Sequence, residues 1–126
     1  MKRDFFTQLE SWPNGPHPIP HTVIGGLQND IPASPSDPWF FFHHSQLDRI
    51  WAIWQTRDEQ NRRTAMANPD DYSAERQRRG WGDSVAVGMD SVISFGNGTE
   101  WDGVFGQAKV GDVMSPTEGA YCYRYE

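Results

Sequence analysis

The residues of this 126-residue chain best suited to chemistry are its four histidines, which all fall between positions 17 and 44. His17 and His21 are four residues apart, and on a helix this spacing places both imidazoles on one face, about one turn apart. Two imidazoles in that arrangement are a common local geometry for binding one metal ion. A third nitrogen has to come from elsewhere, and His43 or His44 in the next predicted helix is well placed to supply it.

The ligand type alone does not select one metal. Imidazoles suit copper, zinc, nickel or iron, and a catalytic zinc site with three histidines and one open position would have the same spacing. A metal binds the neutral imidazole, and the unpaired amides in the first turn of a helix disfavour the imidazolium form. On spacing alone, the alternative is that these are ordinary histidines in a proline-rich loop and a buried helix.

The helix expected to carry His43 and His44 has the clearest start in the sequence. Asp37 is a favoured N-cap residue, and Pro38 at the first helical position has no amide hydrogen to lose. Apolar residues then recur at helical spacing on a broad face, and the last part of the pattern is polar. These features predict a helix from Pro38 to about Asn61.

A second helix at the candidate site is expected over about His17 to Leu27, after a short helix within residues 3–10. Pro18 and Pro20 lie in its first turn, where proline costs little because the amides there are unpaired. Ile19 precedes Pro20, so it is expected to leave the helical region. That departure would distort the local arrangement of the candidate ligands.

The rest of the chain is expected to be largely irregular. Residues 27–36 have the composition of a loop, a short helix is expected over Tyr72–Arg79, and one or two short strands are expected within residues 80–118. Residues 120–125 alternate with period two, which predicts a terminal strand with three tyrosines on one side. The length suits a single domain over residues 1–126, and the expected fold is mainly α with irregular loops and a short terminal β-strand.

Composition and charge exclude several classes of function. The formal net charge is -6 and the isoelectric point is about 5.1, which argues against nucleic-acid binding and against docking on anionic lipid. Mean hydropathy is -0.73, and the sequence has no run of about 18 apolar residues that would span a membrane.

Cys122 is the only cysteine, so no intrachain disulfide can form. Residues 1–10 show no signal peptide, and the compartment stays open.

A long stretch around the candidate ligands resembles the CuB half of the tyrosinase and catechol oxidase family, whose members are type-3 copper proteins. The family pattern reads roughly PHN-x-x-H, then GG, then SPNDP-x-F-x-x-HH-x-x-x-D-R-x-W-x-x-WQ. This chain has HTVIGG from His21 and SPSDPWFFFHHSQLDRIWAIWQ from Ser34. Tyr121-Cys-Tyr-Arg-Tyr125 is similar to the Tyr-x-Tyr strand that closes the family's catalytic domains. The resemblance covers about residues 9–125, the C-terminal half of the usual catalytic core.

The resemblance implies copper as the cofactor and names its ligands. His17 and His21 match the first two CuB ligands of the family. Of the adjacent pair the family uses the second residue, so the resemblance implies His44 as the third ligand and leaves His43 for packing or hydrogen bonding.

The resemblance also assigns supporting roles to other side chains. Phe40 matches the aromatic residue that packs beside the CuB imidazoles. Asp48 and Arg49 match a pair on the same helix that braces the site, in line with the general need for an outer layer that orients metal ligands.

Two positions depart from the family pattern near the first ligand. Tyrosinases of the family often have Asn directly after that ligand, where it works with an upstream Glu to hold a water that takes the phenol proton. Here the Asn position is Pro18, and Glu10 is the candidate for the upstream acid, at a spacing that differs slightly. The absence of the Asn favours oxidation of diphenols over hydroxylation of monophenols.

The resemblance implies an oxidoreductase that converts o-diphenols to o-quinones with O2, built on half of a four-helix bundle. The family's CuA half supplies three further histidines, and this chain has only His43 left over. The partner expected is therefore a chain carrying CuA, or a second copy in a homodimer. The alternatives are a non-enzymatic mononuclear metal-binding module and a degenerate or truncated product. Without the CuA helices a large apolar patch is expected to be exposed.

Overall fold

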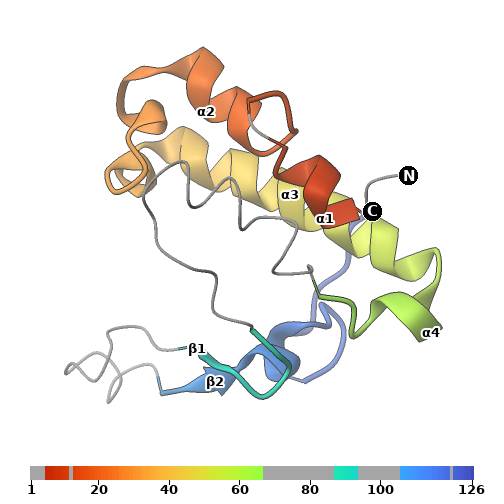
Figure 1. The fold of residues 1–126 in the computed structure, drawn as a ribbon. Helices are drawn as coiled ribbons and strands as arrows, with labels where there is room; N and C mark the ends of the chain where they lie inside the picture. The colour runs from red at the N-terminus through yellow and green to blue at the C-terminus, as the bar shows by residue number, and fades with distance from the viewer. Residues whose placement is uncertain (1–4, 12, 67–86, 94–105, 120) are drawn as a thin grey trace. The chain divides into compact units, whose positions relative to one another are not determined.

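The structure is a computed structural model that describes residues 5–11, 13–66, 87–93, 106–119 and 121–126. It divides into two compact units, Met1–Arg57 and Asp58–Glu126, and every candidate site residue lies in the first. The prediction of a mainly α fold is confirmed, and no helix among the described residues is long and apolar enough to cross a membrane. The first unit holds α1 (Phe5–Leu9), α2 (Pro18–Ile24), the 3-10 turns η1 (Gly26–Asn29) and η2 (Ser34–Ser36), and α3 (Pro38–Thr56) (Figure 1).

The start of α3 is the one predicted from the sequence. The Asp37 carboxylate accepts a hydrogen bond from the Trp39 amide at 3.0 Å, and Pro38 occupies the first turn. This cap satisfies one of the amides that a helix N-terminus leaves without a partner. The capped turn fixes where the helix begins and therefore which faces carry the residues that follow.

The end of α3 comes earlier than predicted. The helix stops at Thr56, and a separate short helix, α4 (Glu59–Arg62), follows. Thr56 Oγ1 donates to the Ile53 carbonyl at 2.9 Å, a side-chain bond that competes with the helix ladder. Asp58 then adopts φ -159° and ψ 66°, outside the helical region, and its carboxylate accepts from the Asn61 side chain. The polar end of the pattern thus forms a second helix rather than extending the first.

The two prolines in α2 do not distort it as expected. The helix begins at Pro18, and Ile19 is helical although it precedes Pro20, so the expectation that Ile19 leaves the helical region is wrong. The steric bias before proline is opposed here because the Ile19 amide donates to the Gly15 carbonyl at 3.1 Å. His17, the N-cap residue, already has helical angles of φ -75° and ψ -56°.

A tight turn before α2 depends on Gly15. A Cβ atom at this position would lie 2.5 Å from the Leu9 carbonyl oxygen and 2.6 Å from the Ser11 amide nitrogen, closer than real Cβ contacts. The backbone of His17 also donates to Leu9 O at 3.1 Å. The absence of a side chain at Gly15 therefore lets the start of α2 fold back against the end of α1.

The segment between α2 and α3 is more ordered than the loop predicted for residues 27–36. Gly25 and Gly26 have positive φ angles of 67° and 56°, and this left-handed pair ends α2. The turns η1 and η2 follow, and within them Gln28 and Ser34 are 2% and 3% exposed. The chain thereby reverses direction, and α2 and α3 lie side by side (Figure 1).

The second unit contains α4, the strands β1 (Val92–Ile93) and β2 (Ala108–Lys109), and the 3-10 turn η3 (Val110–Val113). The two strands pair antiparallel, with Val92 opposite Lys109 and Ile93 opposite Ala108. A short strand in this part of the chain was predicted and is confirmed. The helix expected over Tyr72–Arg79 lies outside the described residues.

The strand expected at residues 120–125 is not formed in the described part, residues 121–126. Tyr123 donates its amide to the Pro116 carbonyl at 2.8 Å, and the sheet of the described residues contains only β1 and β2. The alternation of this segment is nevertheless visible in the tyrosine rings: those of Tyr121 and Tyr123 are 6.0 Å apart and those of Tyr123 and Tyr125 are 5.6 Å apart.

Large apolar side chains of the first unit are exposed in unusual number. Exposed fractions reach 78% at Val23, 69% at Phe42 and 65% at Ile31. The expectation of an exposed apolar patch therefore agrees with the burial of these residues. The further exposed side chains of α2, η1 and α3 are Ile19, Ile24, Leu27, Trp39, Phe41 and Ile53.

The cap of α3 generates a prediction for stability. Replacing Asp37 with Ala removes the acceptor for the Trp39 amide and is expected to lower the free energy of unfolding by about 1 kcal/mol. Asp37→Asn keeps a side-chain oxygen at the cap and should change it by a few tenths of that amount. Urea unfolding followed by circular dichroism measures both, and equal losses in the two variants would contradict the capping role.

Candidate metal centre

All four histidines meet at one place in the first unit. Each offers one ring nitrogen, and these four atoms lie within 4.8 Å of one another. His17 and His21 come from the start and middle of α2, while His43 and His44 come from the second turn of α3. All four are half-buried, so the cluster is partly shielded from water and still reachable.

His17 is held by a carboxylate. Its Nδ1–H donates to Glu10 Oε2 at 2.7 Å, with the two side chains 30% and 40% exposed. An imidazole whose Nδ1 is occupied in this way keeps Nε2 as the nitrogen available to a ligand. The contact also places the candidate acid Glu10 directly against the ring of a candidate metal ligand.

His21 is held by a backbone carbonyl. Its Nδ1–H donates to the carbonyl oxygen of Gln28 at 2.9 Å, so Nε2 is again the available nitrogen. Gln28 itself is almost fully buried in η1. The 3-10 turn after α2 therefore fixes the orientation of this ring.

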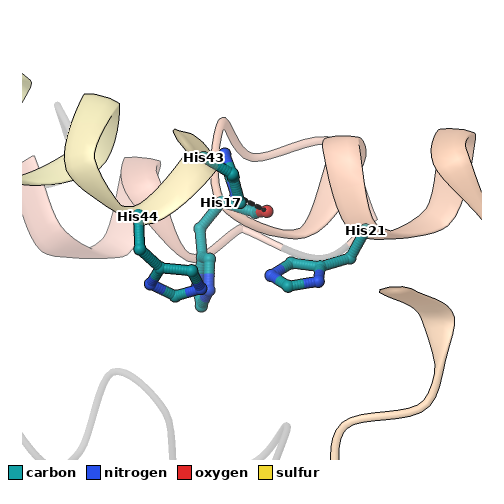
Figure 2. Close-up of side chains that lie close together, drawn as sticks. All are labelled: His17, His21, His43 and His44. Atoms are coloured by element: carbon teal, nitrogen blue, oxygen red, sulfur yellow. Dashed lines mark hydrogen bonds between the residues drawn. The ribbon is translucent and has the colours of Figure 1, made fainter. Parts of the chain in front are cut away.

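His43 is turned differently from the other three. Its Nε2–H donates to the backbone carbonyl of His17 at 2.9 Å. Figure 2 shows this bond as a dashed line, with the rings of His17, His21 and His44 extending together away from it. Consecutive residues of a helix point about 100° apart. His43 can therefore bind the α2 backbone while His44 faces the cluster.

His44 carries the least satisfied nitrogen of the cluster. Its Nε2 is buried and has no hydrogen-bond partner, and a buried polar atom in that state is costly. Burial first, and then the neighbouring imidazoles of His17, His43 and His21, together lower the pKa of His44 to about 4. The ring is thus neutral at ordinary pH, as a metal ligand must be. The pKa of His43 is lowered as well, chiefly by burial.

Phe40 lies where the resemblance places an aromatic residue. Its ring stacks on His44 with a centroid distance of 4.0 Å and an angle of 27° between planes, and it lies 6.2 Å from the ring of His21. The stack fixes the plane of the His44 ring and covers one of its faces.

Asp48 and Arg49 are half-buried on α3, about one turn beyond His44. Their role in bracing the site stays a prediction. Sequence reasoning missed the Gln28 carbonyl, because a backbone acceptor leaves no signature in residue type. It also missed Gly15, whose only signal is its place in a Pro/Gly-rich segment before His17.

The donor set of this centre consists of imidazole nitrogens, with one carboxylate that contacts a ring. Imidazole is a good ligand for copper, zinc, nickel and iron(II), whereas calcium and magnesium prefer oxygen. The Nδ1 atoms of His17 and His21 are occupied, and His44 Nε2 is without a partner. A soft-to-borderline metal ion is therefore the ligand that this arrangement fits.

Comparisons with known proteins identify the family. Residues 2–57 match the common central domain of tyrosinase. Tyrosinase P of Aspergillus terreus is 35% identical over 113 residues, which is 90% of this chain and 28% of that protein. The chain belongs to the tyrosinase family. The tyrosinase-like protein orsC of Emericella nidulans is 54% identical over 52 residues, covering 41% of this chain and 14% of that protein.

Another relative is named as an oxidase. N-acetyl-6-hydroxytryptophan oxidase ivoB of Emericella nidulans is 34% identical over 118 residues, covering 89% of this chain and 29% of that protein. No solved structure matches the chain. The chain spans less than a third of the length of these three relatives. The tyrosinase family is a family of copper oxidoreductases.

The lowered pKa of His44 generates a prediction for this tyrosinase-family chain without metal. The unfolded histidine titrates near 6.5 and the folded one near 4. Between these values the unfolded state binds more protons, so the free energy of unfolding should fall as pH decreases from about 6.5 towards 4.

Urea unfolding of the metal-free chain at several pH values measures this effect. The variant His44→Leu removes the titrating group and should lose less stability over the same interval. The prediction fails if the variant and the parent chain lose stability equally, or if the His44 ring is protonated near pH 6.5 by NMR.

Proposed function

We propose that the chain binds one copper ion through His17, His21 and His44 and takes part in the oxidation of o-diphenols to o-quinones by O2. The observation that carries the proposal is the buried, unpartnered Nε2 of His44. It belongs to a cluster in which a second partner occupies Nδ1 of each of the other two rings. Three nitrogens are thus left for one ion, and His43 is engaged with the backbone.

We propose copper and not zinc because of the family to which the chain belongs. The three imidazole nitrogens alone would suit either ion. The matching family model and the oxidase names of the relatives support a metal that changes oxidation state. When bound, copper would supply the redox couple that takes electrons from a diphenol and passes them to O2.

The overall reaction balances without a further reductant. Each o-diphenol gives up two electrons and two protons as its two C–O bonds become carbonyls. Two such molecules supply the four electrons and four protons that reduce one O2 to two waters. The protein must therefore hold the metal ligands in place and let the o-diphenol and O2 reach the metal ion.

Both side-chain and backbone groups of this unit hold the candidate ligands in place. Glu10 and the Gln28 carbonyl each fix one ring of α2 through its Nδ1–H. Phe40 covers one face of the His44 ring and keeps water from that side. Positioned ligands of this kind cost less to organise when the ion binds.

Diphenols are favoured over monophenols by the residues around His17. Pro18 stands where many tyrosinases have an Asn, and proline has neither a side-chain donor nor an amide hydrogen. The Glu10 oxygen nearest the cluster contacts the His17 ring directly. The pair that would hold a proton-accepting water is therefore incomplete, and a substrate that ionises more easily is the better fit.

A coupled pair of copper ions needs nitrogens from outside one copy of the chain. The chain has four histidines, of which three are proposed as ligands. The partner we propose is a chain carrying the CuA half, or a second copy. Exposed apolar side chains on α2, η1 and α3 support such an interface, because large exposed apolar patches usually mark one.

A second candidate function is a mononuclear metal-binding module without oxidase activity. It is favoured by the fact that all four histidines form a single cluster. This candidate needs no partner, and it predicts metal binding without turnover.

Copper loading tests the site. We expect about one Cu(II) per chain in the parent protein and loss of stoichiometric binding in His44→Ala, because that variant removes the buried imidazole nitrogen of the cluster that has no hydrogen-bond partner. Gln46→Ala is the matched control on the same helix, since Gln46 is exposed and has no proposed role in the site. Metal analysis with mass in solution gives the stoichiometry. Folded parent protein without copper, or unchanged binding in His44→Ala, contradicts the proposed site.

The same material separates the two functions. A copper-loaded dimer without an EPR signal that oxidises catechol supports two coupled ions from two copies. A monomer with an ordinary mononuclear Cu(II) signal and no catechol oxidation, alone or with a CuA-bearing chain, supports the binding module instead.

A further inference from the structure

We infer that Glu10 is a positioning residue that acts on the bound metal ion through the ring of His17. In this arrangement its carboxylate sets the donor strength of His17 Nε2, in addition to any part it takes with substrate. The inference deepens the proposed function, because it rests on the metal site of His17, His21 and His44. It assigns the acid a task that does not involve a water or a phenol.

The three candidate ligands are supported in three different ways. His17 donates to a charged carboxylate at 2.7 Å, His21 donates to a neutral backbone carbonyl at 2.9 Å, and His44 Nε2 has no partner. Hydrogen bonds to an ionised acceptor are shorter and roughly twice as strong as neutral ones. His17 is therefore the ligand whose orientation and electron density are most strongly set by a neighbour.

Backbone hydrogen bonds of both residues hold the Glu10 and His17 side chains next to each other. The Glu10 amide continues the turn of α1 by donating to Phe6 O at 3.0 Å, and the His17 amide donates to Leu9 O at 3.1 Å. The intervening turn closes over Gly15, which has no room for a side chain. Glu10 and His17 are thus brought together by the fold and do not depend on a chance meeting of two surface side chains.

The position of the carboxylate has two consequences for the ring. First, it selects the tautomer with hydrogen on Nδ1, which leaves the Nε2 lone pair for the metal. Second, negative charge beside Nδ1–H increases the electron density at Nε2, and such outer partners typically change metal affinity by about 10- to 100-fold. A richer donor favours the more highly charged ion, so Cu(II) should gain more than Cu(I).

The variants Glu10→Ala and Glu10→Gln test the inference on the full 126-residue chain. Zn(II) is the first probe, since it neither oxidises a phenol nor needs O2. We expect the Kd for Zn(II) to rise about 10- to 100-fold in Glu10→Ala. Glu10→Gln keeps an oxygen acceptor for Nδ1–H but loses the charge, so its Kd should rise by less. Glu59→Gln is the control, because it removes the same charge from α4, where the carboxylate pairs with Arg63.

Two readouts separate positioning from a general loss of structure. Nitrogen-15 NMR of the metal-free chain should show His17 with hydrogen on Nδ1 in the parent and in Glu10→Gln, and with a shifted tautomer balance in Glu10→Ala. Competition with chelators should show that Glu10→Ala weakens Cu(II) binding more than Cu(I) binding, so that the reduction potential of the bound copper rises. A disordered variant would instead lose both ions together and would show it by circular dichroism.

The outcomes distinguish this inference from the proposed function. Parent protein that binds Zn(II), with Kd unchanged within about twofold in Glu10→Ala, overturns the role of Glu10 and leaves the site intact. Parent protein that is folded and binds neither Zn(II) nor copper overturns the site and this inference with it. Equal weakening of Cu(II) and Cu(I) in a folded Glu10→Ala variant also overturns it, since the charge would then have no electronic effect.

Discussion

The hydrogen bond from His43 Nε2 to the backbone carbonyl of His17 is the contact on which the site depends. It joins residues 26 positions apart in the sequence and fastens the second turn of α3 to the start of α2. Because neighbouring helix residues point about 100° apart, fixing His43 against the backbone turns His44 towards His17 and His21. One histidine of the adjacent pair therefore anchors the helices while the other faces the cluster. Without that anchor, the i, i+4 pair on α2 would have no third nitrogen at a fixed distance.

Short-range constraints prepare each helix for that contact. On one side, Gly15 allows the backbone before α2 to approach Leu9 and Ser11 more closely than any side chain would permit. On the other, the positive φ angles of Gly25 and Gly26 end α2 and start the turn that brings the Gln28 carbonyl to His21. The apolar surface of this unit is meanwhile largely exposed, so the hydrophobic effect contributes less than usual. Polar contacts and backbone geometry consequently carry more of the local order here than in a domain with a full core.

Much of this arrangement could be predicted from the sequence, and the misses have identifiable causes. The start of α3 was predictable because Asp37 and Pro38 act locally through one amide and one fixed dihedral angle. Its end was not, because the pattern stays polar and helix-compatible through Asn61 while the break depends on the angles of a single residue, Asp58. Ile19 was mispredicted because the steric bias before proline was weighed alone, without the backbone hydrogen bond that its amide donates to the Gly15 carbonyl four residues earlier. The spacing relates His17 to His21 and suggests His43 or His44 as a third partner, but only the resemblance chooses between those two, because nothing in the spacing specifies the α2–α3 contact.

The number of histidines limits how many copper ions one copy of this chain can bind. A type-3 centre of the kind found in this family uses six histidines, three for each ion, whereas the chain has four. The fourth, His43, has its Nε2 occupied by the His17 carbonyl, and releasing it would remove the contact that sets the geometry of the other three. In this arrangement Nε2 of His43 therefore serves as the anchor of the two helices and not as a further ligand. A second ion would need ligands from outside these 126 residues, and the exposed apolar side chains of α2 and α3 are the surface on which the proposed partner would bind.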